Sequence, residues 1–345
     1  GADWGPMDAW LTREDPTVLI CTYEKADALI RFLGPMFLSR ISLVVIDEAH
    51  SVQFEGETET LRTGDSRALR LESLTARLLA RLDQSGGRAI ALSAAASGIE
   101  GALASWAAGR LLAEPIKSSY RSTRQLVGRL QCLRGGRFEM RYDVLDGASL
   151  HFDNGQGDVP YVPDPFPPCP QPPGPPRTWA GAEKGLRPPL LWAAAHLASP
   201  DVRGRRHAVL ISVTQGIAGY GRDFLSLLQS PWGQDIPPLF DVPTGPMKKT
   251  IWERCLKSCE DYFGSNSYEY QLLTRGIVVH HGRMPGLLSR LCVDLIDERV
   301  VHVVLATSTL SEGVNLPFEI VLIPTLRRCA VELSVREFCN LVGRA

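Results

Sequence analysis

The most constraining feature of the sequence is a short apolar run that ends in two adjacent acids. Residues 41–50 read Ile-Ser-Leu-Val-Val-Ile-Asp-Glu-Ala-His. The run has the length and the β-branched side chains of a strand buried on both faces, as in a parallel sheet flanked by helices. Open α/β sheets bind ligands at the carboxyl ends of such strands, and two carboxylates there are costly without a nearby cation. The run predicts an α/β fold with a candidate site at Asp47 and Glu48.

The chemistry of these two acids favours a nucleotide that carries Mg²⁺. Asp47 would be the carboxylate ligand of the metal, and Glu48 would be the base that positions an attacking water. The alternative is a solvated corner between a strand and a loop, where acids are common. The residues of this run leave both interpretations open.

The bulk properties indicate a soluble two-domain protein. A length of 345 residues suits two domains better than one. The net charge is −1, so any nucleic-acid binding must come from local patches. No apolar run approaches the roughly 18 residues of a membrane span, and no signal peptide is visible. The eight cysteines form no Cys-x-x-Cys pair, which predicts reduced thiols in a cytoplasmic protein that does not bind membranes.

Strands and helices alternate on both sides of the acidic run. The pattern predicts strands over 17–22, 41–46 and 88–93 and helices over 23–33, 67–84 and 99–109. A second series predicts strands over 207–213, 276–280, 300–306 and 319–324, with helices over 190–198, 216–228, 248–260, 268–275, 285–297 and 334–342. Alternation at this spacing is typical of parallel α/β layers with right-handed crossovers.

The segment between the two layers has a different composition. It contains strand-like pieces such as 138–144, and residues 159–176 are dense in proline, which predicts an irregular insertion without a compact element. We therefore expect a first domain over 1–116, a linker with a Pro-rich insertion over 117–188, and a second domain over 189–345.

The ordered motifs resemble those of superfamily 2 helicases. Asp47-Glu48-Ala49-His50 is similar to the tetrapeptide that names the DEAD/DEAH-box proteins. Further similarities to this family, and to its Ski-type branch, lie at 21–25, 92–95, 280–282, 305–317 and 338–345, in the family's order. Tyr23, Ala95 and Asn340 depart from the family's pattern.

The resemblance implies two tandem RecA-like domains that bind ATP and Mg²⁺ and hold single-stranded RNA or DNA. By position, Asp47 would contact the metal, Glu48 would handle the water, and Arg344 would be an arginine finger. Four residues match positions with other roles in the family: Gly313 and Asn315 beside the nucleotide, and His50 and Ser93 in coupling that site to the other domain. Thr22 and Thr307 would hold phosphates of the bound strand, although Thr22 also suits a plain helix N-cap.

Two motif elements of the family are missing from this sequence. No Gly-x-x-x-x-Gly-Lys-Ser/Thr loop occurs, and the last motif stops before its second arginine. We therefore expect a fragment of a longer protein with both RecA-like domains truncated, and expect this fragment alone to be inactive as an ATPase. The function expected for the full-length protein is that of an ATP-dependent helicase or translocase. The alternatives are a non-hydrolysing nucleic-acid-binding scaffold and a motor subunit of a larger defence, restriction or repair complex.

Overall fold

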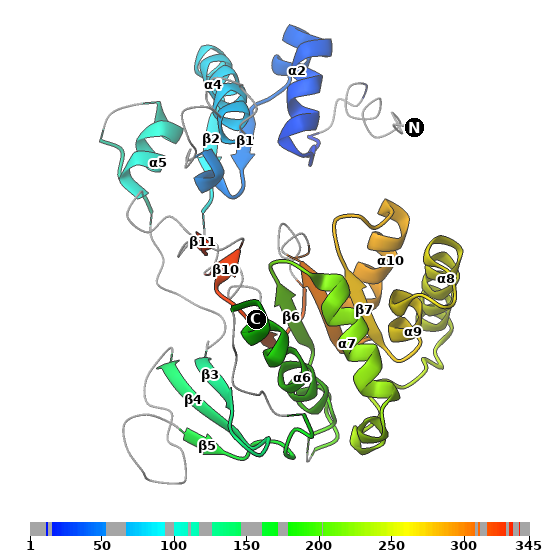
Figure 1. Ribbon diagram of the computed structural model, residues 1–345. Coiled ribbons are helices and arrows are strands. Elements are labelled where there is room, and N and C mark those ends of the chain that lie inside the picture. The colour runs from blue at the N-terminus through cyan, green and yellow to red at the C-terminus, as the bar shows by residue number, and fades with distance from the viewer. Residues whose placement is uncertain are drawn as a thin grey trace. The chain divides into compact units, whose positions relative to one another are not determined.

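The computed structural model describes most of the chain (Figure 1). The described residues are 16–52, 67–93, 100–109, 112–116, 126–145, 161–171, 179–201, 203–307, 316–328 and 331–333, with the single residues Thr12, Leu310 and Phe338. The chain forms two compact units, Gly1–Ser119 and Tyr120–Ala345, and each is described by itself. In the part of the chain that the structure describes, no helix combines the length and the apolar character needed to cross a bilayer.

The first unit has a parallel pair of strands with helices beside it. Its elements are α2 (Tyr23–Leu38), β1 (Leu43–Ile46), the 3-10 helix η1 (Ala49–Val52), α4 (Arg67–Ser85), β2 (Arg88–Ala91) and α5 (Glu100–Ala108). β1 and β2 are parallel, with Val45 opposite Ile90. The predicted parallel α/β pattern is confirmed for these two strands and for the helix between them.

The leucine spacing of α4 explains how this unit packs. Leu74 and Leu78 lie one turn apart and are buried against Leu29, Ile30 and Phe37 of α2. α2 itself is kinked, because Gly34 has a φ of 49° and is followed by a proline. The predicted break after residue 33 is therefore a kink, and the helix continues to Leu38.

Two predictions for the first unit are wrong. Residues 17–22 form no strand, and Val18 and Ile20 are 85% and 91% exposed. An apolar, β-branched stretch becomes a strand only where a neighbouring strand pairs with it. Among the described residues of this unit, β1 pairs with β2, and no strand pairs with residues 17–22. β1 is also not buried on both faces, because Leu43 and Val45 are about half exposed, at 51% and 52%.

The second unit is built on a four-stranded parallel sheet. Its elements are β3 (Leu126–Cys132), β4 (Phe138–Leu145), β5 (Tyr161–Pro163), α6 (Trp179–Leu197), β6 (Val209–Val213), α7 (Ile217–Gln229), the 3-10 helix η2 (Pro231–Asp235), α8 (Pro246–Phe263), α9 (Tyr268–Leu273), β7 (Ile277–His280), α10 (Gly286–Asp297), β8 (Val303–Thr307), β9 (Ile320–Leu322), β10 (Arg327–Arg328) and β11 (Val331–Glu332). The parallel strands follow the order β7-β8-β6-β9, and parallel sheets of this kind fit a RecA-like fold.

Both faces of this sheet are buried, as the apolar runs predict. Ile211 and Leu305 are register partners and pack with α6 and α7 on one face. Leu210 and Val304, one position earlier, pack with α8 and α10 on the other face (Figure 1). Successive side chains of a strand point to opposite faces, so a continuous apolar strand needs helices on both sides.

The Pro-rich insertion contains a compact element, contrary to the prediction. β3, β4 and β5 form an antiparallel sheet, and Phe138 and Cys169 are buried in the same core as α6. The turn between β3 and β4 depends on Gly136, whose φ is +81°. A Cβ on Gly136 would lie 2.0 Å from the carbonyl oxygen of Cys169, so only glycine allows this close approach.

The described cysteines are free thiols, and most are buried. Cys255 of α8 and Cys292 of α10 lie with their Sγ atoms 3.9 Å apart. Burial, and then the neighbouring Cys255, raises the pKa of Cys259 to about 12, so this thiol stays protonated and inert at neutral pH.

Candidate active site

The two acids lie at the carboxyl end of β1, where the sequence places them. The strand ends at Ile46, and the chain then turns through Asp47 and Glu48 into η1. Oδ1 of Asp47 accepts a hydrogen bond from the backbone N–H of Glu48 at 2.9 Å. Asp47 is exposed. Its carboxylate is therefore fixed at the strand end and open to a ligand.

Glu48 has an unusual backbone conformation. Its φ is +51°, in the left-handed region that residues other than glycine seldom adopt. Such strain costs of the order of 1 kcal/mol and tends to occur at functional sites. Oε2 of Glu48 lies 3.2 Å from Nε2 of His50, although the contact lacks hydrogen-bond geometry and leaves this buried oxygen unsatisfied. A carboxylate oxygen held in this way can accept a proton or a water hydrogen.

His50 connects the ends of the two strands. It is 1% exposed, and its Nδ1 lies 2.8 Å from Oγ of Ser93, which follows β2. The backbone N–H of Ala49 also donates to the carbonyl of Leu92 at 2.8 Å. If Nε2 carries the imidazole proton and faces Glu48, the Ser93 hydroxyl donates to Nδ1. The structure thus brings Glu48, His50 and Ser93 into one series of contacts.

The two threonines lie in separate units. Thr22 is the N-cap of α2, and its side chain accepts from the backbone N–H of Lys25 at 3.5 Å. This is the plain capping role that the sequence leaves open. Thr307 ends β8 and is the register partner of Val213 in β6. It lies at the carboxyl edge of the second sheet, the usual ligand-binding edge of a parallel sheet.

His280 lies at the same edge, at the end of β7. It is 6% exposed, and its Nε2 is 2.7 Å from Oγ of Ser289. Burial, and then the neighbouring His281, lowers the pKa of His280 to about 4. The imidazole is therefore neutral at physiological pH.

Sequence reasoning missed Arg187, because it falls in the expected linker. Arg187 lies on α6, forms an ion pair with Asp223 at 3.3 Å and stacks 4.6 Å above the ring of Tyr220. A Cβ on Gly219 would come within 2.4 Å of its guanidinium. The small residues Gly216 and Gly219 at the start of α7 are the sequence signal of this close approach.

Three predicted residues lie outside the described residues: Gly313, Asn315 and Arg344. Their expected contributions to a nucleotide site stay predictions. The structure therefore brings together Asp47, Glu48, His50 and Ser93 and gives no position for the remaining nucleotide ligands.

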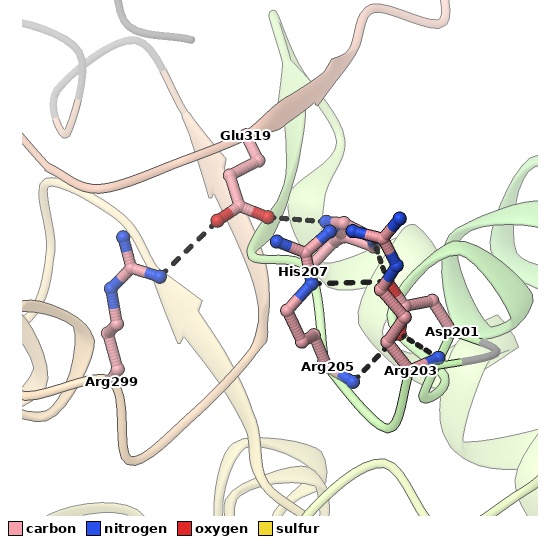
Figure 2. A network of polar contacts seen from close by, with 6 residues as sticks. All are labelled: Asp201, Arg203, Arg205, His207, Arg299 and Glu319. Carbon is pink, nitrogen blue, oxygen red and sulfur yellow. Dashed lines mark hydrogen bonds and ion pairs between the residues drawn. The ribbon is translucent and has the colours of Figure 1, made fainter.

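A polar network lies at the opposite, amino edge of the second sheet. Figure 2 shows its members: Asp201, Arg203, Arg205, His207, Arg299 and Glu319. Glu319 lies 2.5 Å from His207 and 3.3 Å from Arg299, and Asp201 accepts backbone bonds from Arg203 and Arg205. The backbone bond from Arg205 is the main reason that the pKa of Asp201 is lowered. The contact between Glu319 and His207 ties the starts of β6 and β9 together.

Comparison with known proteins points to helicases. No protein-family model matches the chain. It is 24% identical over 351 residues to Hachiman protein HamB of Bacillus cereus, which covers 100% of this chain and 28% of HamB. It is 26% identical over 350 residues to the ATP-dependent DNA helicase Hel308 of Caldivirga maquilingensis, which covers 99% of this chain and 37% of Hel308.

A shorter match joins the chain to the antiviral helicase SKI2 of Saccharomyces cerevisiae. The identity is 36% over 78 residues, which is 21% of this chain and 6% of SKI2. Weak homology relates the chain to superfamily 2 helicases. The chain spans 28% and 37% of the lengths of HamB and Hel308, so the activity of the whole protein is a matter for proposal.

Proposed function

We propose that the chain is part of an ATP-dependent helicase or translocase and that Glu48 activates the water that attacks the nucleotide. The observation that carries this proposal is the strained backbone of Glu48, directly after a parallel strand and beside a buried histidine. The full-length protein would couple hydrolysis of ATP to movement on single-stranded RNA or DNA. The homology to Hel308 and SKI2, both named helicases, supports this reading.

The acid pair fits a nucleotide-bound Mg²⁺. This cation usually keeps several waters and binds one or two carboxylates together with the phosphates of the nucleotide. Asp47 is exposed and offers one carboxylate, which matches this need. Bound Mg²⁺ would polarise the phosphate oxygens, while Glu48 would orient the water. We assign Gly313, Asn315 and Arg344 to the same nucleotide by their positions in the family's motifs.

The remaining assignments concern coupling and strand binding. His50 and Ser93 would pass changes at the acid pair to the rest of the motor, since their contact joins the ends of β1 and β2. Thr22 and Thr307 would hold phosphates of the bound strand. For Thr22 this role competes with its N-cap bond to Lys25, which a phosphate could displace.

The test of the proposed function is Glu48→Gln in the full-length protein. The amide keeps the size of the side chain and cannot accept a proton, so turnover of ATP should fall by roughly 10²–10⁴-fold. Binding of nucleotide and of a single-stranded oligonucleotide should survive. The matched control is Glu72→Gln, an exposed acid on α4, which should leave turnover unchanged. Steady-state phosphate release measures both variants.

Two results would contradict the proposed function, and a third would contradict the expectation that this fragment alone is inactive. Unchanged turnover in Glu48→Gln would remove Glu48 from the role of base. Turnover by the 345-residue chain alone that depends on Glu48 would contradict our expectation that this fragment is inactive. An absence of turnover in the full-length wild-type protein would favour the non-hydrolysing scaffold.

A second candidate is a motor subunit of a larger defence or repair complex. The name of the antiviral helicase SKI2, which matches 21% of this chain, favours a role in defence over a general one. Nuclease or recognition domains on either side in the full-length reading frame would support this candidate.

A further inference from the structure

A cavity lies at the amino edge of the four-stranded sheet, beside the segments that lead into β6, β8 and β9. Its volume is about 480 Å³, within the range of roughly 300–1,000 Å³ that small-molecule sites occupy. The residues that line it are Arg205, Arg206, His207, Arg299 and Glu319. Three of these five residues are arginines, so the cavity suits an anionic ligand.

Two of the arginines are held in place by acids beside the cavity. The guanidinium group of Arg206 donates to Asp241 at 3.1 Å, and only 12% of its side chain is exposed. Nε of Arg205 donates to Asp201 at 3.3 Å, and 66% of the Arg205 side chain is exposed. A guanidinium group has five N–H donors, so a contact through Nε orients Arg205 and leaves its terminal donors available to a ligand.

Arg299 occupies a backbone position that favours glycine. It follows α10 with a φ of +51°, and its N–H donates to the carbonyl of Ile296 at 3.0 Å. The N–H of Val300 donates to the carbonyl of Leu295 at 2.9 Å. These two bonds form the Schellman pattern of a helix C-terminus, in which the left-handed residue is usually glycine. The end of the helix does not need an arginine there, so its conformational cost points to a use for the side chain.

Glu319 shows that two basic groups of the cavity converge on one oxyanion. Its carboxylate lies between Arg299 and His207, at 3.3 Å from the first and 2.5 Å from the second (Figure 2). The Glu319 side chain is 39% exposed. A ligand anion can therefore reach this place from solvent and compete with the carboxylate for Arg299.

His302, at the entry to β8, indicates the sign of the local electric field. Burial lowers the pKa of His302, and Arg206 and Arg299 lower it further, against smaller opposite effects of Asp241 and Glu319. The positive charges thus outweigh the acids at this point of the edge. Nδ1 of His302 is also buried, and no described residue offers it a hydrogen bond.

We propose that this cavity binds the phosphate group of a small phosphorylated ligand, with Arg205 and Arg299 as its direct partners. A guanidinium group matches phosphate with two parallel N–H bonds. Arg206 adds positive charge at the wall, and Glu319 is an internal carboxylate that competes with the phosphate. The proposal does not rest on the proposed function, because it uses neither the acid pair nor the carboxyl edge of the sheet.

The experiment measures hydrogen exchange of the full-length protein by mass spectrometry while inorganic phosphate or adenosine 5′-monophosphate is added at constant ionic strength. In the wild type, peptides that cover 203–207 and 298–302 should exchange more slowly as either ligand is added, and the titration gives a dissociation constant at this place in the chain. Arg205→Gln with Arg299→Gln should raise that constant at least about tenfold, because charge-assisted hydrogen bonds are lost.

Two further variants separate ligand binding from folding. Arg299→Gly should raise the urea midpoint of unfolding, because glycine suits the left-handed backbone, and should still weaken binding of phosphate. A purely structural role of Arg299 would not produce this combination. Glu319→Gln keeps the size of the side chain and removes the competing charge, so it should tighten binding by up to about fivefold.

The matched control removes two positive charges from exposed positions elsewhere in the second unit. Arg254→Gln with Arg275→Gln should leave the dissociation constant within about twofold, because salt screens distant surface charges. Three results would overturn the proposal: no slowing of exchange in the wild type with either ligand, equal slowing in the Arg205/Arg299 variant, or weaker binding in Glu319→Gln.

Discussion

The buried imidazole of His280 should make the stability of the second unit depend on pH. Its pKa is about 4 in the folded protein, mainly because of burial, and the unfolded value is that of an ordinary histidine. The unfolded state therefore takes up a proton that the folded state refuses, and stability falls as the pH drops from about 6.5 to about 4. At a pH of about 5.5 the loss should be roughly 1.2 kcal/mol relative to pH 7.

Urea unfolding at several pH values, followed by circular dichroism, measures this effect. The comparison is with His280→Gln, whose amide can still bond to Ser289 but does not titrate. The free energy of unfolding of this variant should fall less steeply over the same pH window. Equal slopes for the two proteins would show that other groups, such as His302, dominate the acid sensitivity.

Single residues also show how far the sequence can predict the site. The position of the acid pair directly after a strand was predictable, because an apolar, β-branched run ends immediately before it. The contact between His50 and Ser93 was not, because it joins positions 43 residues apart and depends on the pairing of β1 with β2. The positive φ of Glu48 was also hidden, since no residue type there signals it.

Among the elements, the entry into β7 depends on a glycine. Gly276 has a φ of +76°, and a Cβ there would lie 2.1 Å from Cβ of Phe240. Gly276→Ala should lower the free energy of unfolding by about 2–4 kcal/mol, from backbone strain and overpacking together. The control is Gly286→Ala at the start of α10, where a Cβ meets nothing within 4 Å. That change should be neutral or stabilising by up to about 1 kcal/mol. Chemical denaturation measures the free energy of unfolding of both variants. Equal losses of stability in the two variants would contradict the close contact between Gly276 and Phe240.

Elements with strong periodicity were predicted well and others were not. The helix expected over 67–84 is α4, Arg67–Ser85, because its leucine stripe is decisive. The helix expected from 190 begins at Trp179, since Pro188 and Pro189 inside it hide the pattern. β5 was missed because prolines usually exclude strands, whereas Pro163 lies at the end of an edge strand, where it is tolerated.

At the scale of the whole molecule, the two compact units should respond separately to core mutations. Leu74 belongs to the core of the first unit and Leu305 to a core of the second, and both are at most 2% exposed. Leu→Ala at either site should cost about 2–5 kcal/mol. Hydrogen exchange should show Leu74→Ala loosening α2 and α4, and Leu305→Ala loosening β6 and β8. Equal loosening of both units by either change would show that they unfold as one.

The extent of the second unit could not have been predicted from composition. A Pro-rich segment reveals no packing partner, so 126–171 read as a connection. In the structure Phe138 and Cys169 share a core with α6, and the segment belongs to the compact unit Tyr120–Ala345.

The left-handed backbone at Glu48 has a consequence for how this chain could change. Glycine would occupy that φ without a steric penalty, so Glu48→Gly would relax the turn and delete the carboxylate in one step. One substitution would then both relieve the backbone strain and remove the carboxylate that we propose orients the water. Selection for stability alone would favour glycine at this backbone conformation. A glutamate there fits selection for the proposed activity instead.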